Sequence, residues 1–350
     1  MTHVSLRDSR LNILIATPFE PENVDLITEA IPEGEVVFRP DLLPTARYTA
    51  DHGGDASRIA AVKATEWASL LAEAEVMLSL DLATDGGLRT RAPKLRWVQG
   101  TSSGMADQVR RSGLLGSDVI VTTAAGIHAG PLSEWVLMAA LYFAKRVPML
   151  RRWQTELHWE RFAVGELAGR RAVLLGVGAV GRKVAATLSA VGVEVAARRR
   201  RADAEEIPGV ARLLTTRDQW EAALSAADFV VIAAPATPET RHLLGPHEIA
   251  LLGPEAVVIN IGRGWVVDQN ALIDALQKGK IGGAALDVFE EEPLPSSSPL
   301  WKMENVLISP HSASTVPAEN RRIAALFANN IRRYSSGQPL INRFDPARRY

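Results

Sequence analysis

Short apolar strands alternate with helical stretches along almost the whole chain, and this alternation constrains the fold more than any other feature. Such a pattern is typical of parallel sheets whose two faces are covered by helices. We therefore expect an α/β protein with doubly wound parallel sheets. Apolar segments of strand character in the first part of the chain are expected at residues 11–16, 35–38, 76–80 and 95–99.

A second series of strands and helices begins after Gly169 and has the pattern of a doubly wound nucleotide-binding domain. Its strands are expected at residues 171–176, 193–197, 227–235, 256–262 and 281–289. The Pro/Ser-rich stretch 291–299 is expected to be a linker. The strand and helix that follow are too short for a third domain, so they should return to complete the first one.

These patterns predict a substrate domain made of residues 1–101 and 306–350, and a dinucleotide-binding domain made of residues 102–305. A chain of 350 residues ordinarily forms two or more domains, which agrees with this division. A long helix is expected to begin near Pro131, inside the second domain.

Composition excludes several classes of function. The formal net charge is −1, so no bulk field would attract nucleic acid or an anionic membrane. The longest apolar run, Trp135–Ala144, is about half as long as a membrane-spanning helix. The chain has no cysteine, hence no disulfide and no thiolate metal site. Together with a polar N-terminus that lacks a secretory signal, this favours the cytoplasm.

The glycine-rich turn GVGAVG, residues 176–181, follows a predicted strand and opens a predicted helix. Glycines in this context allow a tight turn and let a pyrophosphate approach the free N–H groups of the helix N-terminus. The strand before and the helix after make the pattern more specific than a glycine-rich turn alone. The expected cofactor-binding residues of the turn are Gly176, Gly178, Ala179, Val180 and Gly181.

The end of the next strand predicts the choice of cofactor. A site for NAD usually places a carboxylate there to bind the ribose 2′-hydroxyl, but this chain has Arg198, Arg199 and Arg200. Arginine can hold a 2′-phosphate with two hydrogen bonds, so NADP(H) is the preferred cofactor and NAD(H) the alternative. A run of arginines can also be a solvated loop, and that reading stays open for one or two of them.

Three side chains with complementary chemistry follow strands in the last third of the chain: Arg263, Glu292 and His311. An imidazole with a pKa of about 6.5 suits proton donation near neutral pH, and a carboxylate can fix its tautomer and favour its charged form. A guanidinium group can bind a substrate carboxylate and polarise a carbonyl. The set predicts reduction of a small 2-oxo acid with His311 as the general acid.

Metal chemistry is not expected, because no histidine or carboxylate pair has metal-site spacing. Of the other histidines, His128 and His242 are expected to take no part in proton transfer.

Five ordered segments resemble the D-isomer-specific 2-hydroxyacid dehydrogenase family, glyoxylate/hydroxypyruvate reductase-like branch, and the match is continuous from about Leu95 to Ala313. They are residues 176–181, 227–245, 260–272, 283–301 and 305–313. The resemblance implies a Rossmann nucleotide-binding domain inserted into a flavodoxin-like substrate domain, with the active site in the cleft between them. It also implies that the catalytic arginine, glutamate and histidine of the family are Arg263, Glu292 and His311.

Further roles are implied by this resemblance. It places Pro235, Thr240 and Asp287 near the cofactor. The loop that contains Ser103, Gly104 and Met105 corresponds to the loop that binds the substrate carboxylate through backbone N–H groups. The helix from Pro131 resembles the arm through which family members dimerise, so a homodimer formed by the nucleotide-binding domain is expected.

Two readings from other classes compete with an enzyme of this kind. A nucleotide-sensing, corepressor-like interaction protein could use the same fold without significant turnover. The intact set of Arg263, Glu292 and His311 argues against it. A methyltransferase that uses the glycine-rich turn is a poor alternative, because its cofactor needs an acidic ribose partner where this chain has arginine.

Overall fold

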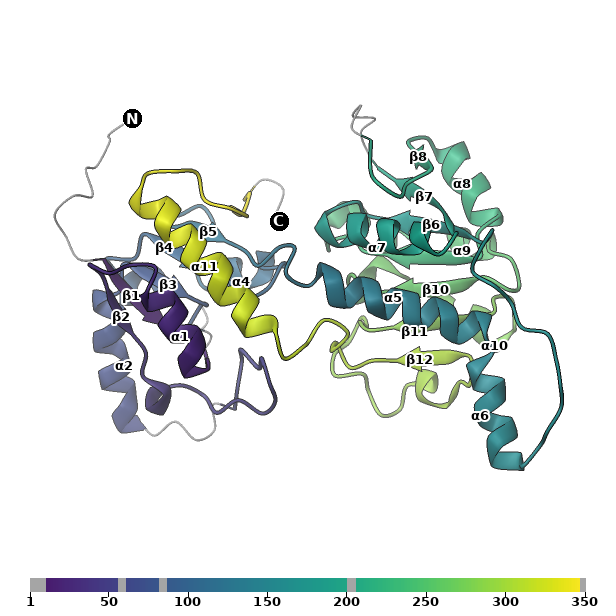
Figure 1. The fold of residues 1–350 in the computed structure, drawn as a ribbon, viewed down its shortest axis with the longest axis horizontal. Coiled ribbons are helices and arrows are strands. Elements are labelled where there is room, and N and C mark those ends of the chain that lie inside the picture. Colours follow the sequence, from purple (N-terminus) through teal and green to yellow (C-terminus); the bar gives the residue numbers. More distant parts are fainter. Residues whose placement is uncertain (1–10, 56–60, 82–86, 200–205, 347–350) are drawn as a thin grey trace. The chain divides into compact units, whose positions relative to one another are not determined.

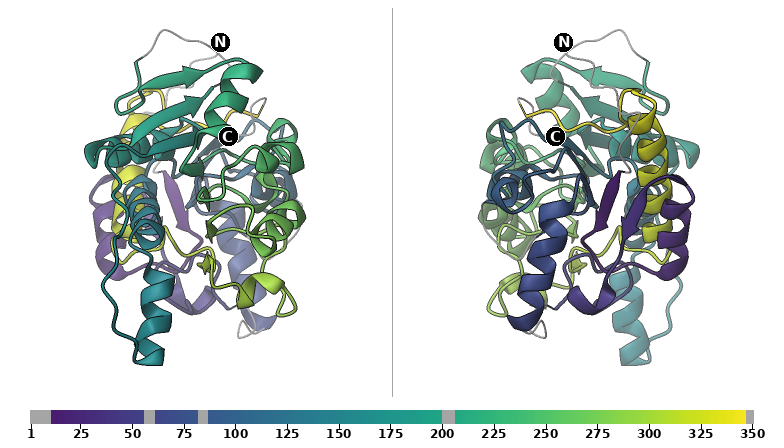
Figure 2. Two further views of the ribbon diagram at one scale, coloured as in Figure 1. Left: turned by 90° about the vertical axis from the view of Figure 1, so that its right-hand side faces the viewer. Right: turned by 90° about the vertical axis from the view of Figure 1, so that its left-hand side faces the viewer.

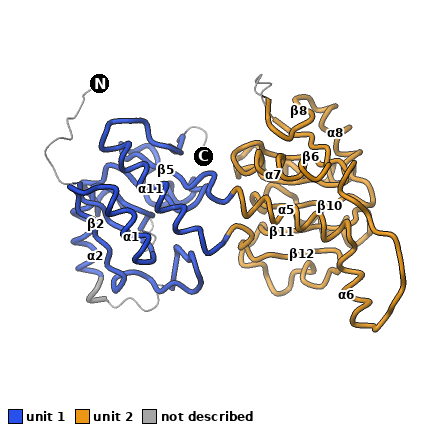
Figure 3. The backbone as a smooth tube through the Cα atoms, in the orientation of Figure 1, with its two compact units in different colours: residues 1–128, 315–350 blue, residues 129–314 orange. Residues whose placement is uncertain are grey.

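The computed structural model describes residues 11–55, 61–81, 87–199 and 206–346, and the chain forms two compact α/β units. Unit 1 contains residues 1–128 and 315–350, and unit 2 contains residues 129–314 (Figure 3). Unit 2 is therefore inserted into unit 1, and the chain passes from one unit to the other twice.

The observed division differs from the predicted boundaries at 101/102 and 305/306, because strand pairing decides where each segment belongs. Strand β5 (Ile120–Thr122) pairs with β4 (Trp97–Gln99) in the sheet of unit 1. Strand β12 (Val306–Ile308) pairs with β11 (Gly283–Leu286) in the sheet of unit 2. The Pro/Ser-rich stretch 291–299, predicted to be a linker, lies within unit 2 instead of joining the units.

Unit 1 contains a five-stranded parallel sheet of order β2-β1-β3-β4-β5. This is the flavodoxin-like order expected for the substrate domain. Its first strands are β1 (Asn12–Ile15), β2 (Glu35–Val37) and β3 (Val76–Leu78). A short 3-10 turn, η1 (Pro40–Leu42), follows β2.

Helices cover both faces of this sheet because successive strand residues point to opposite sides. Ile13 and Ile15 of β1 pack with α1 (Pro21–Thr28) and α11 (Glu319–Ser335). Leu14, between them, faces the other core, to which α2 (Ala61–Glu73), α3 (Leu88–Arg91) and α4 (Ala106–Arg111) contribute. Figure 2 shows α2 and α11 on opposite sides of the sheet.

Helix α11 completes unit 1 after the second passage of the chain, as the sequence predicted. Its fully buried residues Ile323, Phe327 and Ile331 recur every four positions and form one apolar stripe. The Phe327 ring lies 5.2 Å, centroid to centroid, from the ring of Trp97 on β4. The returning helix is thus part of the core of unit 1.

Unit 2 contains a seven-stranded parallel sheet of order β12-β11-β10-β9-β6-β7-β8 (Figure 1). It is the Rossmann order extended by one strand, as expected for the nucleotide-binding domain. The remaining strands of this sheet are β6 (Arg171–Leu175), β7 (Glu194–Arg198), β8 (Arg212–Leu214), β9 (Phe229–Ile232) and β10 (Val257–Asn260). The short strand β8 was not predicted from the sequence.

Two groups of helices cover the two faces of this sheet. One face packs against α5 (Ala129–Ala144) and α7 (Ala179–Ala190). The other packs against α8 (Arg217–Ser225), α9 (Pro246–Ala250) and α10 (Gln269–Gln277). Helix α6 (Val147–Glu156) follows α5 and points away from the sheet (Figure 1). Among the described residues, no helix combines the length and apolarity needed to cross a membrane.

The strand order of unit 2 reverses between β6 and β9, which are neighbours in the sheet but not in the sequence. In open α/β sheets, ligands bind outside the carboxyl ends of the strands at this reversal. The loops that follow β6, β9, β10, β11 and β12 all begin at that edge. Three of these loops contain short 3-10 helices: η3 (Pro238–Thr240), η4 (Gly264–Val266) and η5 (Pro299–Lys302).

Candidate active site

The glycine-rich turn joins β6 to α7 at this edge of the sheet. The absence of a side chain has a different structural consequence at each of its three glycines. Gly176 has φ of +99°, and a Cβ there would lie 2.8 Å from the Ala233 carbonyl. A Cβ on Gly181 would lie 2.0 Å from the Gly176 carbonyl oxygen. At Gly178, in contrast, a Cβ would meet open space, and this residue is the N-cap of α7.

A glycine at the N-cap has no side chain that could occupy the N–H groups of the first helical turn, which contains Ala179 and Val180. Open space in front of a helix N-terminus suits an anion, and the helix dipole favours negative charge there. The turn therefore has the geometry that binding of a dinucleotide pyrophosphate would require.

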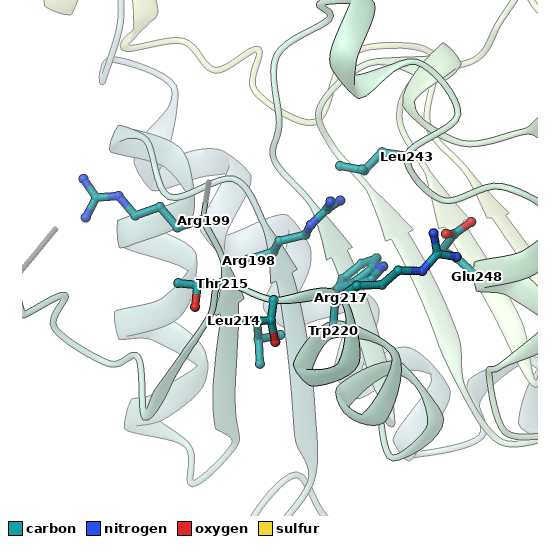
Figure 4. Close-up of a pocket in the computed structure, with 9 residues that line it drawn as sticks. Arg198, Arg199, Leu214, Thr215, Arg217, Trp220, Leu243 and Glu248 are labelled. Atoms are coloured by element: carbon teal, nitrogen blue, oxygen red, sulfur yellow. The ribbon is translucent and has the colours of Figure 1, made fainter. Parts of the chain in front are cut away.

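A pocket of about 290 Å³ lies at the carboxyl ends of β7 and β8 (Figure 4). Its cationic residues are Arg198, Arg199 and Arg217. Arg200, the third arginine of the predicted set, lies outside the described residues. The other lining residues are Leu214, Thr215, Thr216, Trp220, Leu243 and Glu248.

Arg198 is held in this pocket by the ring of Trp220. Its guanidinium carbon lies 4.9 Å from the centroid of the indole ring, within the range of a cation–π contact. Burial lowers the pKa of Arg198, while the charge of Glu248 acts in the opposite direction. The sequence did not predict that Arg217 lines this pocket. Arg217 begins α8, the helix that follows the unpredicted strand β8.

His311 and Glu292 form the centre of the candidate site. Nδ1 of His311 lies 2.8 Å from Oε2 of Glu292, and Oε1 of Glu292 accepts a hydrogen bond from the Phe289 N–H at 3.0 Å. The carboxylate is thus fixed by its own loop on one side and holds the imidazole on the other. With Nδ1 directed at Glu292, Nε2 is the nitrogen available for proton transfer.

The electrostatics of this pair favour a charged acid and a charged base. The hydrogen bond to Glu292 raises the pKa of His311, and it outweighs the opposing effects of burial and of the Arg263 charge. Burial raises the pKa of the Glu292 carboxyl, but hydrogen bonds from His311 and from the Phe289 N–H lower it by more. The result is an imidazolium–carboxylate pair in which His311 keeps its proton to a higher pH than an unpaired histidine would.

Arg263 follows β10 and lies near this pair, since its charge lowers the pKa of both His311 and Glu292. Its Nη1 donates to the Gly262 carbonyl at 2.7 Å, and its own carbonyl accepts from Nδ2 of Asn260 at 3.1 Å. A Cβ on the next residue, Gly264, would lie 1.9 Å from the Phe289 carbonyl carbon. Only glycine therefore allows the loops of Arg263 and Glu292 to pack this closely.

Asp287, predicted to lie near the cofactor, has a clear structural partner in the His311 turn. Its Oδ1 accepts hydrogen bonds from Oγ of Ser309 at 2.7 Å and from the N–H groups of Ser312 at 2.9 Å and Ala313 at 3.0 Å. The His311 N–H donates to the Asp287 carbonyl at 2.9 Å. This carboxylate, only 2% exposed, therefore holds the turn on which His311 has φ of +54°.

The remaining predicted residues lie in two other loops. After β9, Oγ1 of Thr240 donates to the Pro235 carbonyl at 2.7 Å, which closes a tight turn. In unit 1, the loop after β4 contains Ser103, Gly104 and Met105. The Met105 side chain is 2% exposed and anchors that loop, because a Cβ on Gly100 would overlap its sulfur at 1.6 Å.

Within the described ranges, no group of three or more histidine, cysteine, aspartate or glutamate side chains could hold a metal ion.

Comparison with known proteins identifies the class. Residues 137–313, about half of the chain, match the family described as D-isomer specific 2-hydroxyacid dehydrogenase, NAD binding domain. The chain is 34% identical over 275 residues to a glyoxylate reductase of Aeropyrum pernix, covering 74% of this chain and 80% of the relative. The chain belongs to the D-isomer specific 2-hydroxyacid dehydrogenase family, a family of NAD(P)-dependent oxidoreductases.

Solved structures agree over almost the entire chain. A D-isomer specific 2-hydroxyacid dehydrogenase of Xanthobacter autotrophicus, in complex with NADPH and MES, is similar with a TM-score of 0.78 and 31% identity. That match covers 98% of this chain and 100% of the other. An NADPH-dependent glyoxylate/hydroxypyruvate reductase of Sinorhizobium meliloti, in complex with NADP and sulfate, has a TM-score of 0.77 at 26% identity, covering 97% and 100%.

The His311–Glu292 pair predicts a measurable titration. In E292Q, we expect the pKa of His311 to fall, because a neutral amide replaces the carboxylate that stabilises the imidazolium. The wild-type ring should stay protonated at a pH where the E292Q ring has already lost its proton. NMR titration of the His311 ring C–H, assigned by its loss in H311N, measures this.

A matched control is E304Q, since Glu304 is an exposed carboxylate paired with Arg152 at 3.2 Å. It should leave the titration of His311 unchanged. A His311 pKa in E292Q equal to or above the wild-type value would contradict the assigned hydrogen bond.

Proposed function

We propose that this protein reduces a small 2-oxo acid, similar to glyoxylate or hydroxypyruvate, to the D-2-hydroxy acid with NADPH. The observation that carries the proposal is the pairing of His311 with Glu292 at 2.8 Å beside the charge of Arg263. The names of the relatives support the substrate class. The hydrogen bond between His311 and Glu292, with Arg263 on the neighbouring loop, supports the roles of acid, orienting base and carboxylate-binding cation.

In the proposed mechanism, Arg263 binds the substrate carboxylate and polarises the adjacent carbonyl. The reduced nicotinamide, when bound, supplies a hydride to the carbonyl carbon. Nε2 of His311 donates a proton to the carbonyl oxygen, so one 2-oxo acid, one hydride and one proton give one 2-hydroxy acid. Glu292 accepts from Nδ1 throughout, which fixes the ring and stabilises its charged form before transfer.

The loop of Ser103, Gly104 and Met105 remains a predicted anchor for the substrate carboxylate through its backbone N–H groups. Pro235, Thr240 and Asp287 remain predicted neighbours of the cofactor. For Asp287, the hydrogen bonds to the His311 turn support a role in holding the acid in place as well.

NADP(H) is the proposed cofactor because the pocket at the ends of β7 and β8 is lined by Arg198, Arg199 and Arg217. A ribose 2′-phosphate carries a negative charge that these guanidinium groups could bind with charge-assisted hydrogen bonds, which a neutral 2′-hydroxyl could not match. Similar solved structures contain NADPH or NADP, which supports the same choice. The nucleotide-sensing alternative explains the pocket but not the oriented acid.

The lack of cysteine in the sequence supports a cytoplasmic location as part of this proposal.

Replacement of His311 tests the mechanism. In H311N, kcat for 2-oxo acid reduction should fall by roughly 10² to 10⁴, because the general acid is removed while the fold of the loop is kept. The assay is loss of NADPH absorbance with a panel of 2-oxo acids. K94Q is the control, since Lys94 is an exposed residue of unit 1 that pairs with Glu73 at 2.5 Å. A rate for H311N close to that of the wild type would refute the role.

The cofactor assignment has its own test. R198Q should lower kcat/KM for NADPH by about 10- to 100-fold, since a charge-assisted hydrogen bond contributes roughly 1.5–3 kcal/mol. The value for NADH should change little. R171Q is the matched control, because Arg171 is an exposed arginine at the amino end of β6, the opposite edge of the same sheet. A wild-type enzyme that prefers NADH over NADPH would overturn the assignment.

We also propose a homodimer formed through α5, α6 and the segment after α6. Leu157 is 92% exposed and Trp159 is 94% exposed, and this part of the chain also exposes Met138, Leu141, Leu150 and Val164. Exposed apolar side chains on neighbouring elements are typical of an interface, and tryptophan is among the residues that contribute most to binding.

The dimer is tested by sedimentation of a variant. W159E should raise the dimer dissociation constant at least about 30-fold, because interface hot spots contribute about 2 kcal/mol or more. Y48E is the control, since Tyr48 is 55% exposed but belongs to unit 1. A monomeric wild type at micromolar concentration would exclude the proposed assembly.

A further inference from the structure

His242 has a backbone conformation that its neighbours must stabilise. Its φ is +47°, a region that costs energy for a residue other than glycine. Its N–H donates to the Trp265 carbonyl at 2.8 Å, and the Leu244 N–H donates to the Val266 carbonyl at 3.0 Å. The Asp268 N–H donates back to the Leu244 carbonyl at 3.0 Å. The segment after η3 therefore lies beside the segment that follows Arg263.

The imidazole of His242 lies between two carboxylates from other loops. Nε2 is 2.9 Å from Oε1 of Glu290, and Nδ1 is 3.6 Å from Oδ2 of Asp268. Glu290 is also tied to Gln269, whose N–H donates to its Oε1 at 3.3 Å. The ring is therefore in hydrogen-bond contact with Glu290 through Nε2 and within ion-pair distance of Asp268 through Nδ1.

Each of the three linked loops carries residues of the candidate active site. His242 follows Thr240 after β9, Asp268 follows Arg263 after β10, and Glu290 precedes Glu292 after β11. The loops after β10 and β11 also touch, because Gly264 approaches the Phe289 carbonyl so closely that no Cβ fits. A shift of Glu290 or Asp268 would therefore be transmitted to the acid–base pair and to the cation.

We propose that His242 is a positioning residue for the reduction: it joins three active-site loops and thereby fixes Arg263 relative to Glu292. This inference rests on the proposed function, since it concerns the geometry of the same reaction. The side chains involved are between 22% and 34% exposed, so the link is only partly open to water. A misplacement of about 1 Å at a reacting centre can cost about 10²-fold in rate, which makes such a link consequential.

The test compares H242A and H242Q with the wild type. In H242A, kcat should fall by about 10- to 100-fold, while the Kd of NADPH from fluorescence titration changes little. The primary isotope effect on kcat with NADPH deuterated at the transferred position should increase, because hydride transfer becomes more limiting. H242Q keeps one N–H donor for Glu290 and should recover part of the lost rate.

A double-mutant cycle tests the link itself. H242A/E290Q should have a kcat no lower than H242A, because both changes break the same contact and their effects are not additive. The matched control is D274N, which removes an exposed ion pair with Lys278 of 2.5 Å on α10, the helix that Asp268 caps. It should leave kcat and the isotope effect at their wild-type values.

Two results would overturn the inference alone: a folded H242A with wild-type kcat, or a lowered melting temperature with unchanged kcat and isotope effect. The second result would mark His242 as merely structural. If H242A does not fold, H242Q and the E290Q single variant decide the same question. A wild-type protein that turns over no 2-oxo acid would refute the proposed function, and this inference with it.

Discussion

The parallel alignment of every strand in the sheet of unit 2 is the constraint on which the rest of the site depends. Because parallel strands end at one edge, the loops after β6, β9, β10, β11 and β12 begin side by side. Residues far apart in the sequence, such as Gly178 and His311, thus belong to one edge of one sheet. An antiparallel sheet would have sent alternate loops to the opposite edge and separated them.

Alignment brings the loops together, but the hydrogen bonds that buried and partly buried carboxylates accept determine how the loops are held. Asp287 accepts three hydrogen bonds from the turn of His311. Glu292 accepts one from the Phe289 N–H through one oxygen and contacts the His311 imidazole through the other. The close approach at Gly264 adds a steric requirement between neighbouring loops. The carboxylate of Asp287 therefore holds the backbone turn that carries His311. The carboxylate of Glu292 stabilises the charged form of the His311 ring.

Much of this arrangement could be predicted because it is encoded locally. Strand–helix alternation predicted both sheets, and the glycine spacing predicted the turn between β6 and α7. The His311–Glu292 contact, inferred from strand-end positions, is confirmed by the 2.8 Å distance between the two side chains. Features that depend on distant contacts were not predicted. Strand β8 is only three residues long and was missed. Without this strand, there was no reason in the sequence to place Arg217 in the same pocket as Arg198.

The sequence by itself determined the elements, the glycine turn and the types of the reacting groups, because these depend on periodicity and on the chemistry of individual side chains. Only the tertiary structure decided which sheet each strand joins, and it moved the unit boundaries to 128/129 and 314/315. It also gave Asp287 its hydrogen bonds to the His311 turn and set His242 between Asp268 and Glu290. Such roles arise from contacts between loops that are distant in the sequence, and no local pattern specifies which partners will meet.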